Sequence, residues 1–103
     1  MNITQFQEYL QKVDIDNITF SNHFVKRAHE RNLDNLKNKA NLHDMFSREI
    51  PERIVNQENN KFKVVYTYNN KYDVVMVISV KSTNKFSISL VTCFLQEVER
   101  RMK

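Results

Sequence analysis

Hydrophobic and polar residues alternate along this chain with two different periods, and the period changes near Pro51. Before that proline, apolar residues recur at the i, i+3, i+4, i+7 spacing of an amphipathic helix within residues 2–13. These residues are Phe6, Tyr9, Leu10 and Val13. We therefore expect a first helix there, with Thr4 and Gln7 spaced as a capping box.

A second helix is predicted over residues 22–32. Ser21 is a suitable N-cap because its hydroxyl can accept from the unpaired amides of a first turn, and no Gly or Pro interrupts the helix. Residues four apart lie about 40° apart around a helix axis. His23, Arg27 and Arg31 therefore form a column on one side. Apolar residues on the adjoining side are expected to attach the helix to a core; they are Phe24, Val25 and Ala28.

The segments on either side of this helix carry weaker signals. Residues 14–20 combine β-branched and acidic residues, and we interpret them as a linker in extended conformation. Residues 34–50 have the composition of one or two short helical turns. Pro51 ends any helix, because it lacks an N–H and restricts the residue before it.

After Pro51 the period becomes two, which is typical of strands. We expect strands at 52–57, 61–68, 72–80 and 85–94, joined by turns at Asn59-Asn60, at Asn69-Asn70 and within 81–84. In the last strand one row of side chains is expected to face the core and the helices. It comprises Phe86, Ile88, Leu90, Thr92 and Phe94. Residues 95–102 are predicted to form a short C-terminal helix.

Helices followed by strands with tight turns indicate an α+β fold. The prediction is a single domain over residues 1–103. Its N-terminal helices pack on a three- to four-stranded antiparallel sheet, and a short C-terminal helix follows.

Composition excludes several classes of protein. The chain has 103 residues with Gly 0, Pro 1 and Cys 1, so it cannot contain a glycine-rich phosphate loop or an internal disulfide. A lone cysteine fits a reducing cytoplasm, where we expect the protein to act. No apolar run reaches the roughly 18 residues of a membrane span. The cysteine and three histidines lack the paired spacing of a zinc site, so we expect neither metal nor cofactor.

The net charge of +4 favours a polyanionic partner, and the 22–32 helix suggests which one. A metal-free ribonuclease needs an acid or base near neutral pH and fixed cations for the charge that grows on the phosphoryl oxygens. His23 suits the first role, and Arg27 and Arg31 suit the second. Thr92, the polar member of its apolar row, is the expected contribution from the sheet.

Further side chains near this set are candidates for binding RNA. Tyr66 and Tyr68 lie in one row of a neighbouring strand and are suited to stacking on a base or donating to phosphate. Glu30 and Lys26 lie on the basic helix itself. Each residue also has a purely structural interpretation: a charged column is often a solvated face, Glu30 can balance Arg27, a threonine can bond backbone, and tyrosines are often core.

The pattern Ser21-x-His23-x-x-x-Arg27-x-x-x-Arg31-Asn32-Leu33 resembles the opening helix of a family of small microbial domains similar to the BrnT and RelE toxins. Their strand meander ends in a Val-Val-Thr-like strand, which Leu90-Val91-Thr92 resembles. Phe24 and Asn32 depart from the family pattern, and residues 34–60 do not match it clearly.

The resemblance implies roles for His23, Arg27, Arg31 and Thr92 in a metal-independent endoribonuclease that cuts RNA through a 2′,3′-cyclic phosphate. It also implies a cognate antitoxin protein as partner. The alternatives from other classes are a catalytically silent module that binds nucleic acid or an acidic protein, and a protein-interaction module of phage or mobile-element origin.

Overall fold

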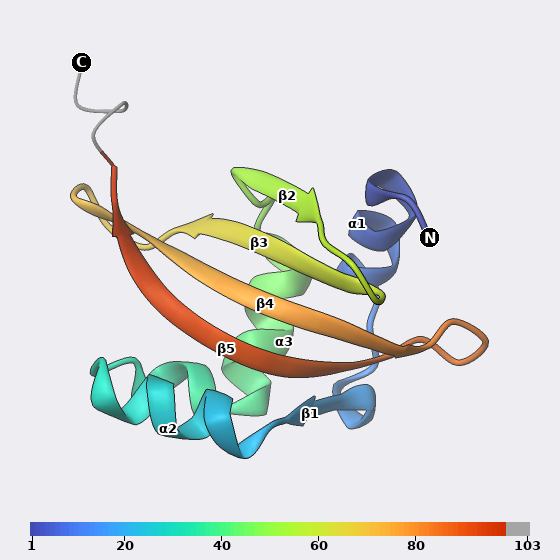
Figure 1. The fold of residues 1–103 in the computed structure, drawn as a ribbon, viewed down its shortest axis with the longest axis horizontal. Coiled ribbons are helices and arrows are strands. Elements are labelled where there is room, and N and C mark those ends of the chain that lie inside the picture. Colours follow the sequence, from blue (N-terminus) through green and yellow to red (C-terminus); the bar gives the residue numbers. More distant parts are fainter. Residues whose placement is uncertain (99–103) are drawn as a thin grey trace.

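The computed structural model describes residues 1–98 and has an α+β fold (Figure 1). Its elements, in chain order, are α1 (Ile3–Gln11), η1 (Ile15–Asn17), β1 (Ile18–Phe20), α2 (Asn22–Glu30), η2 (Asp34–Lys37), α3 (Lys39–Arg48), β2 (Arg53–Asn56), β3 (Lys61–Thr67), β4 (Tyr72–Ser82) and β5 (Ser87–Glu97). The strands form one sheet in the order β1-β5-β4-β3-β2.

The sheet differs from the prediction in its strand number and in its pairing. It has five strands, and β1 pairs with β5 in parallel, whereas the other pairs are antiparallel. The segment predicted to be a linker at residues 14–20 contains β1. The strand escaped prediction because three residues are too few to display a period of two. Its Ile18 is buried and Phe20 packs against the core.

The predicted C-terminal helix at 95–102 is wrong in its described part. Residues 95–97 continue β5, where Leu95 pairs with Val74 and Glu97 pairs with Tyr72. Because β4 is eleven residues long, its first residues are available to pair with residues 95–97. This strand pairing prevails over the helical tendency of their side chains. Residues 99–102 of the predicted helix lie outside the described part of the chain.

Local signals explain most helix and turn boundaries. The N-cap of α1 is Asn2, which forms a capping box with Gln5, so the predicted box starting at Thr4 is wrong. Asn32, Asn59 and Asn60 adopt φ values of 57°, 61° and 59°. Asparagine tolerates this left-handed region better than most residues, and here it takes the role of the missing glycine.

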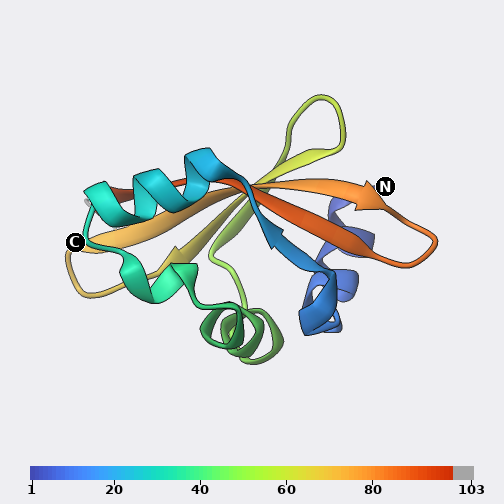
Figure 2. The same ribbon diagram turned by 90° about the horizontal axis from the view of Figure 1, so that it is seen from below.

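The core lies between the helices and one face of the sheet (Figures 1 and 2), and α1 and α3 cover that face. Phe6 of α1 stacks on Phe62 of β3 with ring centroids 4.0 Å apart. Helix α2 lies instead along the β5 side of the sheet. The opposite face, which we call the open face, carries alternate residues of the same strands. Its members on β3, β4 and β5 are Lys61, Lys63, Val65, Thr67, Asp73, Val75, Val77, Ser79, Ser89, Thr92, Phe94 and Gln96.

Candidate active site

A β-bulge at Val91 determines which way the end of β5 faces. Ile78 pairs with Leu90, but the preceding Val77 pairs with Thr92, so β5 contains one extra residue at this point. An extra residue moves every later side chain to the other face of the sheet. Leu90 is therefore in the core, whereas Thr92 lies on the open face.

This bulge corrects the predicted row of side chains on β5. Thr92 and Phe94 do not share a face with Ile88 and Leu90. Cys93 takes the core position instead and is completely buried. A strict period of two cannot reveal one inserted residue, so the sequence pattern predicted the wrong face for Thr92.

Ser21 attaches the start of α2 to this bulge. Its backbone amide donates to the Leu90 carbonyl at 3.0 Å, and its hydroxyl donates to the Val91 carbonyl at 3.0 Å. The same oxygen accepts from the Phe24 amide at 3.0 Å and so caps the helix. One serine thus fixes both the helix and the bulged strand. Sequence reasoning predicted the cap but missed the bond to Val91.

Helix α2 continues the direction of β1 and runs alongside β5 (Figure 1). Its Phe24 and Ala28 are buried in the core, which lies behind the sheet as Figure 1 is drawn. In a right-handed helix seen from its N-terminus, each residue lies about 100° clockwise of the one before it. His23 and Arg27 each precede a buried residue by one position. They therefore lie on a side of α2 that is turned away from the core, where His23 is exposed and Arg27 is half-buried.

The side chains of this helix are arranged around Arg27. Its Nε donates to Nε2 of His23 at 3.5 Å, and its guanidinium forms an ion pair with Glu30 at 3.0 Å. The Arg27 and Glu30 side chains keep 39% and 43% of their surface exposed, so solvent screens the pair. We call His23, Arg27 and Glu30 the α2 column.

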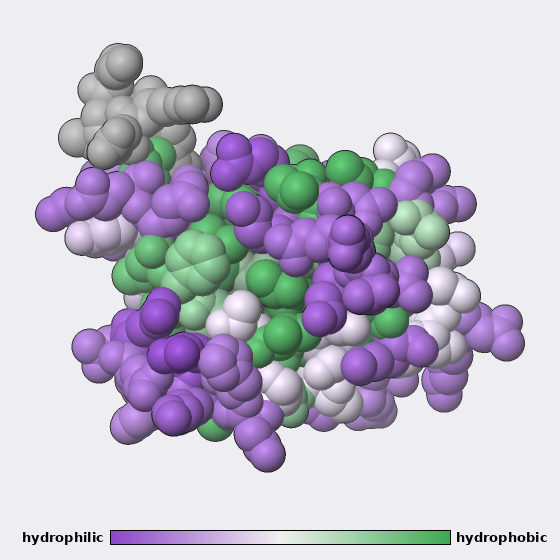
Figure 3. Space-filling model, in the orientation of Figure 1, coloured by the Kyte–Doolittle hydropathy of each residue, from purple (hydrophilic) through white to green (hydrophobic). Residues whose placement is uncertain are grey.

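The open face supplies the floor beside this column. Val65, Val75 and Phe94 pair across β3, β4 and β5 and make an apolar row. Two of them, Val65 and Val75, are buried but do not belong to the core on the helix side. Figure 3 looks onto this face: hydrophobic atoms gather over the middle of the sheet, and hydrophilic atoms cover α2 at the lower left.

The next row of the open face is more polar. Lys63, Val77 and Thr92 pair across the same three strands. Arg53 of β2 pairs with Val65 and extends the apolar row with a cation. Basic groups therefore flank the floor on two sides, from α2 and from the β2–β3 hairpin. Lys63 and Arg53 were not among the predicted site residues.

The remaining predicted residues lie apart from this arrangement. Arg31 is the C-cap of α2, and its backbone amide donates to the Arg27 carbonyl. Within residues 1–98, no side-chain hydrogen bond or ion pair joins its guanidinium to the α2 column. Arg31 lies near the Cys93 thiol instead. Burial raises the pKa of that thiol to about 11, and the positive charge of Arg31 lowers it by a smaller amount. Cys93 therefore remains a neutral thiol near pH 7 and is unsuited to be a nucleophile. Lys26 is exposed on α2.

The two tyrosines differ in their exposure. Tyr66 faces the helices, is 1% exposed and lies 6.1 Å from Phe46 between ring centroids. Its hydroxyl is buried with no hydrogen-bond partner among the described residues, and burial raises the pKa of the phenol. The Tyr66 side chain therefore lies inside the core, and the substrate contact expected of it stays a prediction. Tyr68 lies beyond the end of β3 and is 40% exposed.

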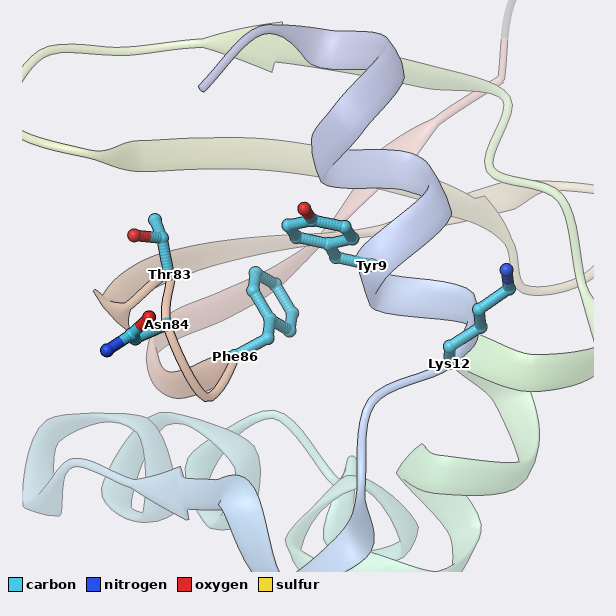
Figure 4. Close-up of a pocket in the computed structure, with 5 residues that line it drawn as sticks. All are labelled: Tyr9, Lys12, Thr83, Asn84 and Phe86. Atoms are coloured by element: carbon cyan, nitrogen blue, oxygen red, sulfur yellow. The ribbon is translucent and has the colours of Figure 1, made fainter.

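A separate pocket of about 290 Å³ lies between α1 and the β4–β5 turn (Figure 4). Tyr9 and Phe86 meet there edge to face with ring centroids 5.3 Å apart. The side chain of Lys12 is directed away from the two rings. This pocket shares no residue with the α2 column or the open face.

Two general features of residues 1–98 complete the description. They contain no group of three or more His, Cys, Asp or Glu side chains arranged to hold a metal ion. Within the same residues, no helix has the length and apolar character needed to cross a membrane.

Comparison with known proteins yields one match. A family model described as the MJ0788 family matches residues 4–78. This span includes the α2 column and ends in β4, so it does not reach Thr92 or Phe94. No curated protein and no solved structure matches the chain.

Proposed function

Given that the chain belongs to the MJ0788 family, we propose that it is a metal-independent endoribonuclease whose active site is formed by the α2 column and the open face. One observation supports the proposal: after the bulge at Val91, Thr92 lies on the open face of β5, and β5 is the strand along which α2 packs with His23 and Arg27. In this proposal His23 supplies the base and Arg27 the cation from α2, and Thr92 supplies a hydroxyl from β5.

The proposed reaction uses the side chains of this surface and a proton from solvent water. Arg27 turns from His23 to the phosphate, and the RNA 2′-oxygen attacks its neighbouring phosphorus while the freed Nε2 of His23 removes the 2′-proton. The bond from phosphorus to the 5′-oxygen breaks, and that oxygen takes up a proton from water. The products are a 2′,3′-cyclic phosphate and a 5′-hydroxyl. Arg27 stabilises the charge on the phosphoryl oxygens, and Thr92 donates a hydrogen bond to one of them.

This assignment makes the protein a relative of the RelE and BrnT toxins in mechanism, and a cognate antitoxin would then cover the open face. Such a partner would suppress cleavage until it is removed. The cytoplasm, where RNA and reducing conditions coexist, is the compartment in which we expect this activity.

The proposal is tested by incubating the purified chain with a labelled RNA in EDTA and identifying the 3′ ends. We expect a cyclic phosphate, and a loss of rate of 10²- to 10⁴-fold for His23→Ala, the usual range for removal of a general base. Arg27→Ala and Thr92→Val should also slow cleavage.

His29→Ala is the matched control, because His29 lies on the same helix but is 75% exposed and pairs with Asp34. Its variant should cleave at the wild-type rate. Equal rates for wild type and His23→Ala would overturn the proposal, as would the absence of cleavage by the wild type.

A second candidate is an RNA-binding module that does not cleave. It is favoured by the fact that, among residues 1–98, His23 is the one histidine on this surface, whereas cleavage uses both a base and an acid. Binding without cleavage, weakened by Arg27→Ala and steeply dependent on salt, is the result expected for it.

A further inference from the structure

Phe94 is the exception among the phenylalanines of this chain. The sequence has seven, and the other six pack against another aromatic ring. Among the described residues Phe94 has no ring partner, and it is half-buried on the open face, outside the helix-side core. A partly exposed ring that no described helix covers is available to a ligand.

The surroundings of Phe94 identify the chemistry of that ligand. Its ring lies at the end of the apolar row next to Val75 and on the same strand as Thr92. Cations stand on both sides: Arg27 on α2 and Arg53 at the far end of the row. Carboxylates on this surface are already engaged, since Glu30 pairs with Arg27 and Asp73 is 8% exposed with a partner of its own.

A partly exposed aromatic ring with cations beyond both ends of its row matches a single nucleic-acid strand, which combines flat bases with a phosphate backbone. We propose that Phe94 stacks on a base of single-stranded RNA next to the phosphate held by the α2 column. This inference rests on the proposed function. It specifies single-stranded RNA as the substrate class, because the bases of a duplex already stack on each other and leave no base free for the ring.

The test compares three probes for binding to the full chain: a single-stranded RNA ten nucleotides long, the same sequence in a duplex, and inorganic polyphosphate. Phe94→Leu removes the ring and keeps an apolar side chain. We expect it to weaken single-strand binding by between about 5-fold and about 150-fold. Polyphosphate binding should not change, because polyphosphate has no bases. Phe94→Tyr should restore the affinity.

Tyr9→Leu is the control, because Tyr9 is also a partly exposed ring, 41% exposed, but lies in the separate pocket of Figure 4. Its variant should bind the single strand as the wild type does. If Tyr9→Leu weakens binding and Phe94→Leu does not, the base stacks in that pocket and the inference is wrong.

The outcomes separate this inference from the proposed function. If Arg27→Ala weakens both RNA and polyphosphate binding while Phe94→Leu changes neither, the basic site stands and the stacking role fails. If the wild type binds no RNA, both fail. If the open face instead captures a protein partner that Phe94→Leu releases, with RNA binding unaffected, the ring serves a protein interface and the inference is overturned.

Discussion

The two faces of the sheet are made from alternate residues of the same strands, yet they have opposite characters. The helix face is continuous and apolar, and its members are almost completely buried. The open face mixes an apolar row with lysine, threonine and serine side chains. The difference shows that the helix face supplies most of the buried apolar packing, whereas the partly exposed side chains of the open face, such as Thr92 and Phe94, can meet a ligand.

The sharpest test of this comparison is a pair of truncations. Phe62 on the helix face is 1% exposed and stacks on Phe6, so Phe62→Ala should destabilise the fold by about 3–5 kcal/mol. Val77 on the open face is half-buried, and Val77→Ala should cost about 1 kcal/mol or less. Urea unfolding measures both, and equal losses would contradict the division between the faces.

Ser21 joins α2 to the bulged strand β5, and its two roles can be separated. Ser21→Ala removes the helix cap and the bond to the Val91 carbonyl, so we expect a loss of about 2 kcal/mol. Ser21→Asp keeps an equally good cap but has no proton to donate to Val91, and it should lose about 1 kcal/mol. Wild-type stability in the aspartate variant would mean that the bond to the bulge contributes nothing.

Tyr66 tests whether the helix face tolerates a polar atom. Its hydroxyl is buried and has no hydrogen-bond partner within residues 1–98, so Tyr66→Phe should stabilise the fold by about 1 kcal/mol. Burial raises the pKa of this phenol above its usual 10.0, so the folded protein keeps it neutral. The wild type therefore has its full free energy of unfolding below pH 10 and loses part of it as the pH rises further, because the phenol of the unfolded chain then ionises. The variant should therefore lose less stability than the wild type in alkaline urea titrations.

Two further measurements complete the Tyr66 test. RNA cleavage by Tyr66→Phe should equal that of the wild type, since the side chain does not reach the open face. A destabilised variant would show instead that an internal water binds the hydroxyl.

The smallest change in stability is expected for the exposed ion pair on α2. Glu30→Gln removes the carboxylate that pairs with Arg27, and both side chains are about 40% exposed. The free energy of unfolding should change by no more than about 0.5 kcal/mol, and by less at high salt. A larger loss would mean that the α2 column is more rigid than its exposure implies.

Much of this fold is predictable because local patterns agree with tertiary packing. The apolar stripe of α1, the cap at Ser21 and the left-handed asparagines can all be inferred from residue type and spacing. The parallel strand β1 and the end of β5 were missed, since each depends on a partner strand far away in the sequence. No local signal specifies such pairing.

The candidate site divides in the same way. The spacing of His23 and Arg27 determines their common side of α2, whatever the rest of the fold. The face taken by Thr92 depends on one extra residue in β5, and the burial of Tyr66 depends on which side of the sheet the helices cover. Phe94 was assigned to the core for the same reason that Thr92 was.

The bulge also makes the chain unusually sensitive to a change of length at one position. Deletion of the single codon for Val91 would exchange inside and outside for the second half of β5. Cys93 and Leu95 would then emerge beside the basic helix, while Thr92 and Phe94 would be forced among the buried rings. A substitution at Val91 keeps the number of residues in β5 and therefore the face of each later side chain, whereas a deletion changes both.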